Sequence, residues 1–167
     1  MFTLKPISPD SVDSALAKAE RYRLLHEPHE AESICRDILE VDPANREARI
    51  SLILSLTDQF PHEECAFASA MAVISGLEAP YDRAYYSGIA SERRAKARYA
   101  AGRMGSGGYV YDWIVKALGL FEEAERLRPP GSGDDAILRW NACVRFLERH
   151  KELTLKTEER LEPILLE

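Results

Sequence analysis

Two stretches of the chain place apolar residues at intervals of four and three residues and then end in a proline. They are, in order, Ala31, Cys35, Ile38 and Pro43, and Ala117, Phe121, Ala124 and Pro129. These intervals put the side chains on one face of an α-helix, and a proline does not continue that helix. The repeated spacing therefore predicts packed helices that each end before their proline.

This spacing resembles the second helix of a tetratricopeptide repeat, a unit of two antiparallel helices with about 34 residues. Residues 12–45 resemble one complete repeat, in which Ala19 and Tyr22 stand at the small and large positions of the first helix. The resemblance covers residues 12–56 and 111–150. It implies an all-α fold, a right-handed stack of antiparallel helix pairs with about seven main helices.

Prolines, glycines and capping residues predict where these helices begin and end. The predicted helices cover about 9–26, 29–41, 44–59, 62–77, 81–102, 111–128 and 134–150. We expect one domain over 1–153, and a C-terminal tail at 154–167 whose apolar residues have the spacing of a short docked helix. The glycine-rich segment 102–108 predicts a flexible connector.

The composition bounds the class of protein. Of the 167 residues, 46% are hydrophobic and 30% are charged, which is enough to build a core and stay soluble. The sequence shows no signal peptide and no run of about 18 apolar residues, so we expect a cytoplasmic protein without membrane contact. Three cysteines, Cys35, Cys65 and Cys143, lie far apart in apolar helical patterns, and we expect buried, reduced thiols.

The sequence contains no recognisable catalytic or metal-binding motif. In the stretch HEPHE, His26 and His29 are three residues apart across Pro28, whereas a zinc protease needs two histidines four apart on one unbroken helix. The glycines of 102–108 precede no Gly-Lys-Ser/Thr, so they do not form a phosphate loop. We therefore expect a protein that is not an enzyme and has no cofactor and no metal.

The charge of the chain is distributed unevenly. The net charge is -6, with 7 Lys+Arg against 14 Asp+Glu in residues 1–80 and 15 against 14 in residues 81–167. One basic patch without acids occupies 93–103, and its members are Arg93, Arg94, Lys96, Arg98 and Arg103. Two interpretations are open: a solvated face with Glu92 held by an intramolecular arginine, and a site for an anion or an acidic peptide.

The resemblance also implies a function. Tetratricopeptide proteins are typically adaptors whose concave groove binds a peptide or a helix of a partner, and the first helix of each pair contributes to that groove. The partner-binding residues that we predict are Tyr85, Arg93, Arg94, Lys96, Arg139, Asn141 and Arg145. Leu16 and Glu20 stand where members that bind chaperone C-termini carry lysine and asparagine, which argues against such a partner.

The leading hypothesis is a non-catalytic protein–protein interaction module, an adaptor or scaffold that is a monomer or a weak homodimer. Its partner would be a protein or peptide with acidic and apolar residues. The alternative is a binder of nucleic acid or another anionic ligand through the 93–103 patch. The overall acidity argues against this alternative, because phosphate-binding domains usually carry a basic excess.

Overall fold

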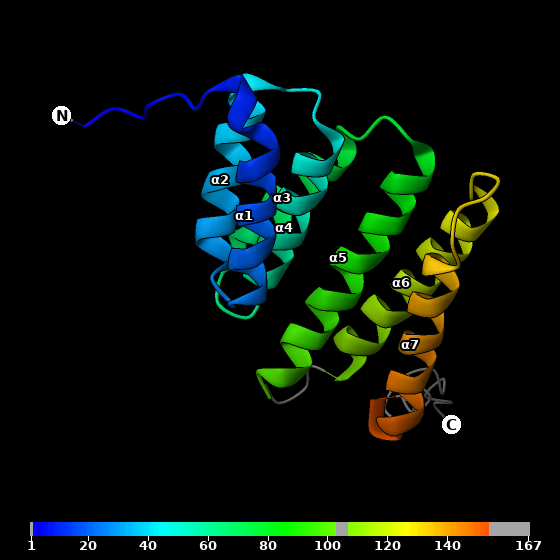
Figure 1. Ribbon diagram of the computed structural model, residues 1–167. Coiled ribbons are helices and arrows are strands. Elements are labelled where there is room, and N and C mark those ends of the chain that lie inside the picture. The colour runs from blue at the N-terminus through cyan, green and yellow to red at the C-terminus, as the bar shows by residue number, and fades with distance from the viewer. Residues whose placement is uncertain (1, 103–106, 154–167) are drawn as a thin grey trace, which may run out of the picture. The chain divides into compact units, whose positions relative to one another are not determined.

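The computed structural model describes residues 2–102 and 107–153, and helices make up most of them (Figure 1). A short 3-10 helix, η1 (Pro9–Ser11), is followed by α1 (Val12–Leu24), α2 (Pro28–Val41), α3 (Arg46–Asp58), α4 (Cys65–Ser75), α5 (Pro80–Ala100), α6 (Gly107–Arg126) and α7 (Asp135–Arg149). The described residues contain no strand, so the all-α prediction is confirmed. In the same part of the chain, no helix is long and apolar enough to cross a membrane.

The contacts divide the chain into two compact units, Met1–Leu77 with α1 to α4 and Glu78–Glu167 with α5 to α7. One domain over 1–153 stays a prediction, because two compact units can both belong to one stack of helical repeats. Within the predicted connector, positions 103–106 lie outside the described residues, and α6 begins at Gly107, earlier than predicted. The predicted tail at 154–167 also lies outside the described residues.

The core of the first unit follows the repeated spacing. Ala31, Cys35 and Ile38 of α2 are fully buried, as that spacing predicts. Helix α3 contacts α1, α2 and α4, so it is buried on most of its circumference and contributes Leu52 and Leu56 to the core. Alanines on α1, α2 and α4 lie in the same cluster, where their small side chains let the helices approach closely.

Two helices bury a face next to the one that their spacing favours. The favoured faces contain Cys65, Ala68, Ser69, Ala72 and Val73 in α4, and Ile137, Trp140 and Val144 in α7. The buried residues are Ala66, Ala70 and Ile74 in α4, and Ala136, Cys143 and Phe146 in α7. Both helices carry apolar residues on adjacent stripes, so the helical period of the sequence fits either face. The helices packed against them determine which face is buried. One consequence is that Cys65 is exposed, and the prediction of a buried thiol is wrong there.

A polar contact joins the end of α3 to α2. The amide Nε2 of the buried Gln59 donates to Glu32 Oε2 at 2.6 Å, and Arg36 Nε donates to Glu32 Oε1 at 2.8 Å. Burial alone would raise the pKa of Glu32, but these donors outweigh it and hold the pKa below the ordinary value of 4.5. The ionised Glu32 therefore stabilises the folded state above that ordinary value, and the contribution is lost as the pH falls below it.

We expect Glu32→Gln to lower the free energy of unfolding more at about pH 7 than at about pH 3, because the carboxyl of the wild type loses its charge as the pH falls below the ordinary pKa value of 4.5. Urea unfolding at both pH values measures the difference. Glu40→Gln is the matched control, because Glu40 is an exposed residue of the same helix. A Glu32→Gln effect of the same size at both pH values would contradict the assignment.

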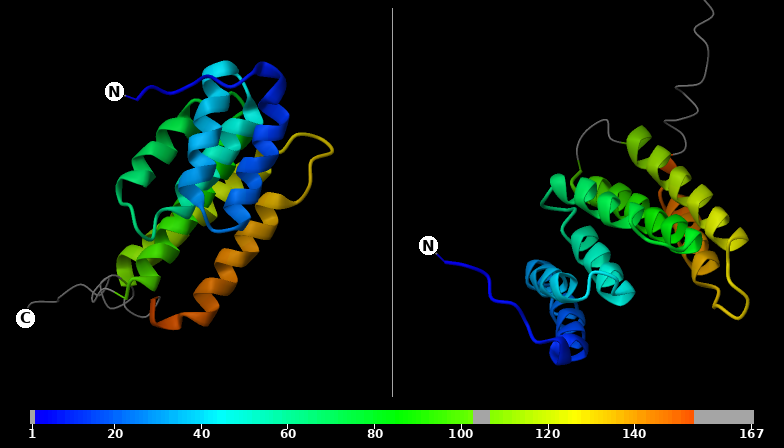
Figure 2. Two further views of the ribbon diagram at one scale, coloured as in Figure 1. Left: turned by 60° about the vertical axis from the view of Figure 1, so that its left-hand side comes forward. Right: turned by 90° about the horizontal axis from the view of Figure 1, so that it is seen from above.

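In the second unit, α5 and α6 lie side by side (Figure 2). They pack closely because Gly88 of α5 leaves room for the ring of Phe121 on α6. A Cβ atom at position 88 would lie 2.6 Å from Phe121 Cε1, which is shorter than any normal contact. Ala117, Phe121 and Ala124 are all 0% exposed, so the face predicted from their spacing is confirmed as buried.

Candidate partner-binding site

The predicted binding residues all belong to the second unit, but they do not form one group. Lys96 and Arg139 lie at the buried Glu92, between α5 and α7. Arg94 instead contacts side chains of α6. Arg93 is half-buried on α5. Within the described residues, no hydrogen bond or ion pair joins the side chains of Asn141 or Arg145 to either group.

A row of cations and aromatic rings follows the packed pair of α5 and α6. We call it the cation–aromatic stripe, and its residues are Arg94 and Arg98 of α5 and Tyr109, Trp113 and Lys116 of α6. The α5 residues are one helical turn apart, and the α6 residues follow one another at four and three residues. These spacings put each set on one face of its helix, so the two faces meet where the helices pack.

Short contacts hold the stripe together. Arg94 Nε donates to the hydroxyl of Tyr109 at 2.6 Å, and the Arg94 guanidinium lies 4.9 Å from the Trp113 ring centroid. Lys116 Nζ lies 4.6 Å from the same Trp113 ring. The Arg98 guanidinium lies 5.5 Å from the Tyr109 ring. Cations over aromatic faces are attracted to the electron-rich ring, so these contacts fix the positions of the positive charges.

The stripe lies at the surface. Lys116 is exposed and the other four members are half-buried. Within the described residues, no acid forms an ion pair with Lys116. Tryptophan, tyrosine and arginine are the residue types that most often carry the binding energy of protein interfaces, and fixed side chains lose less entropy on binding. The stripe thus presents cations and aromatic rings in fixed positions to a partner that carries carboxylates and apolar groups.

The second group surrounds a buried carboxylate. Glu92 is 1% exposed, and its Oε1 lies 2.5 Å from Lys96 Nζ. Its Oε2 has no hydrogen bond, although Arg139 Nη1 lies 3.6 Å away. Burial raises the pKa of Tyr85, and a hydrogen bond from Arg139 opposes that rise. Glu92 thus lies in an internal ion pair, as one interpretation of the sequence expected, but it is buried rather than on a solvated face, and its nearest cation is Lys96, with Arg139 of α7 farther away.

The residues around Glu92 form a structural contact, and the thiol beside them is unreactive. Burial raises the pKa of the neighbouring Cys143 thiol to about 12, and the negative charge of Glu92 acts in the same direction. A thiol with this pKa stays protonated at neutral pH and is a poor nucleophile. Across residues 2–102 and 107–153, no three His, Cys, Asp or Glu side chains are placed to hold a metal ion.

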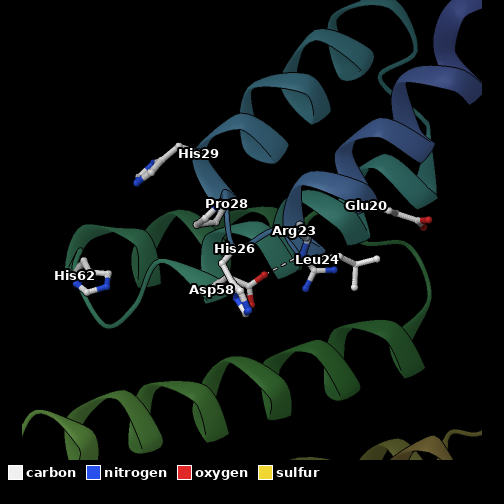
Figure 3. Close-up of a pocket in the computed structure, with 8 residues that line it drawn as sticks. All are labelled: Glu20, Arg23, Leu24, His26, Pro28, His29, Asp58 and His62. Atoms are coloured by element: carbon white, nitrogen blue, oxygen red, sulfur yellow. Dashed lines mark hydrogen bonds and ion pairs between the residues drawn. The ribbon is translucent and has the colours of Figure 1, made fainter.

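A depression in the first unit lies at the start of α2 (Figure 3). It has a volume of about 700 Å³ and is lined by Glu20, Arg23, Leu24, His26, Pro28, His29, Asp58 and His62. Arg23 Nε bonds Asp58 Oδ2 at 2.9 Å, and His29 Nε2 lies 3.5 Å from Glu63 Oε1. Three histidines, His26, His29 and His62, thus line one concave surface, which their positions in the chain do not reveal.

Sequence reasoning also missed Trp113 and Lys116, two of the three residues that α6 contributes to the stripe. The basic run of α5 stands out because no acid interrupts it, whereas Tyr109, Trp113 and Lys116 are spaced along α6 among core residues. Their spacing of four and three residues was the available signal. Comparison of the chain with family models, curated proteins and solved structures found no match.

Proposed function

We propose that the protein is a non-catalytic interaction module that binds a partner segment on the cation–aromatic stripe. The observation that supports this most is the placement of two cations, Arg94 and Lys116, over the ring of Trp113 at the surface. A carboxylate of the partner would bond to the cations, and an apolar side chain beside it would cover the rings. The expected partner is therefore a segment that carries both carboxylates and apolar residues.

The proposal includes the arrangement that the resemblance implies, a right-handed stack of helix pairs. Support comes from the two sets of residues with the same spacing, since Ala31, Cys35 and Ile38 are as fully buried as their counterparts on α6. In such a stack, contacts between neighbouring helix pairs leave extended surfaces for a partner.

A selection from a display library of random peptides on the immobilised protein tests this function. We expect the bound sequences to be enriched in Asp and Glu next to Leu, Ile, Phe or Trp. Their binding should weaken as salt is added, because exposed charges contribute to it. Sequencing of the pool before and after selection measures the enrichment. A pool that gains no acidic residues would contradict the proposal.

One observation favours a second candidate, single-stranded nucleic acid. Tyr109 and Trp113 are 5.8 Å apart between ring centroids, and cations lie beside both. Bases stack on aromatic rings in basic grooves, and the phosphates then contact the cations. The net charge of -6 opposes this binding at long range. If a single-stranded RNA oligonucleotide binds tightly, if salt weakens this binding and if Lys116→Glu abolishes it, the partner is a nucleic acid and not a protein.

A further inference from the structure

The connection between α1 and α2 exposes leucines among glutamates. We call this surface the acidic–apolar corner, and its residues are Glu20, Leu24, Leu25, Glu27 and Glu30. Leu24 is 82% exposed and Leu25 is 59% exposed, and the three glutamates are exposed as well. Within the described residues, none of these glutamates forms an ion pair. Exposed apolar side chains with charges around them are typical of an interaction surface.

The corner adjoins the depression of the first unit. Glu20 and Leu24 line this depression from α1, and Figure 3 shows Leu24 pointing away from the helix at its edge. A neighbouring concave surface gives a partner side chain a place to be buried, which raises the contact area beyond that of the two leucines. The carboxylate of Glu20 would favour a cationic side chain there.

The corner has the composition that the proposed function expects of the partner. It combines carboxylates with apolar side chains, whereas the stripe combines three cations with two aromatic rings. The half of the chain that contains the corner is also acidic overall, since residues 1–80 carry 14 acids against 7 bases, whereas residues 81–167 are nearly balanced at 14 against 15. Complementary patches steer two molecules together and select the orientation of the contact.

We propose that the acidic–apolar corner of one copy of this chain binds the cation–aromatic stripe of a second copy. The inference rests on the proposed function of the stripe and names its partner. Each copy has one stripe and one corner, so each copy can contribute either surface to such a contact. The contact depends on exposed charges, and we therefore expect weak association that salt disrupts.

Analytical ultracentrifugation of the full chain, at concentrations up to millimolar, tests the inference. The wild type should associate as its concentration rises and dissociate as salt is added. Lys116→Glu alters the stripe, and Glu27→Lys/Glu30→Lys alters the corner, so each variant alone should stay monomeric. Arg126→Glu is the matched control, because Arg126 is another exposed cation of α6 and should leave the association unchanged.

Mixing the two variants gives the sharpest result. The Lys116→Glu chain keeps its corner and the Glu27→Lys/Glu30→Lys chain keeps its stripe, so the mixture should associate although neither variant does alone. Failure of the mixture to associate would overturn the inference, as would association that persists in both variants. If the double corner variant does not fold, Leu24→Ser/Leu25→Ser replaces it, with the same expected results.

The association and peptide-binding results together distinguish a failure of this inference from a failure of the proposed function. A wild type that stays monomeric, while selected acidic peptides bind the stripe, would overturn self-association and leave the interaction module standing. A wild type that stays monomeric and binds no acidic peptide would overturn both. Association that Lys116→Glu and the corner variant each abolish, and that their mixture restores, would support both.

Discussion

Phe121→Ala is expected to lower the free energy of unfolding by about 3–5 kcal/mol. Phe121 is 0% exposed, and its ring fills the space that Gly88 leaves between α5 and α6. Truncation removes this apolar surface and leaves a cavity that the two packed helices only partly close. Urea unfolding followed by circular dichroism measures the loss. A loss below about 1 kcal/mol would contradict the packing of α5 on α6.

The contact between Gly88 and Phe121 can also be tested by substitution of the glycine. Gly88→Ala is expected to cost about 1–3 kcal/mol, because the new Cβ overlaps the Phe121 ring. In the Phe121→Ala background this Cβ has room, so Gly88→Ala should no longer destabilise. Gly119→Ala is the matched control, since a Cβ on this exposed helical glycine meets nothing within 4 Å. Equal effects of the two alanines in the wild-type background would refute the close contact.

Removal of both cations around Glu92 is the second change with a large expected effect. Lys96→Met/Arg139→Met should cost on the order of 3–5 kcal/mol, because it leaves a buried carboxylate without a compensating charge. Urea unfolding measures the cost. Lys18→Met/Arg126→Met serves as control, since both of these cations are exposed, and it should change the stability little.

A third substitution shows whether Glu92 is the cause. Glu92→Met added to Lys96→Met/Arg139→Met removes the buried charge and should restore most of the stability, since an apolar cluster can replace a buried ion pair. Side chains in direct contact show such non-additive effects. A triple variant as unstable as the double variant would mean that Lys96 and Arg139 stabilise the unit through other contacts.

The periodic part of the sequence was sufficient to predict most of the fold. Small and large residues at fixed intervals identify the buried faces of α2 and α6, because a face packed on its neighbours must be apolar along its whole length. In α4 and α7 the fully buried residues lie on the stripe next to the predicted one, although Val73 still packs on the core and Trp140 still bonds Glu122 of α6. Two adjacent stripes of these helices are apolar, and only the neighbouring helices distinguish them. The all-α class was thus predictable, whereas the orientation of two helices was not.

The site was predictable to a smaller extent. The basic run on α5 stood out in the sequence, and Lys96 is one turn from Glu92, so their ion pair could be anticipated. Arg139 reaches Glu92 from α7, and Arg94 meets Tyr109 and Trp113 of α6, so these contacts depend on tertiary packing. Neighbouring residues of one basic run therefore belong to two different groups, a division that no local pattern encodes.

Binding of a selected acidic peptide to three forms of the protein tests the role of the stripe most directly. Isothermal titration calorimetry of the wild type, Lys116→Glu and Arg126→Glu compares charge reversals at two exposed cations of α6. We expect Lys116→Glu to weaken binding by about tenfold or more, with a melting temperature close to that of the wild type. Arg126→Glu should bind like the wild type. Equal affinities of Lys116→Glu and Arg126→Glu would contradict the account.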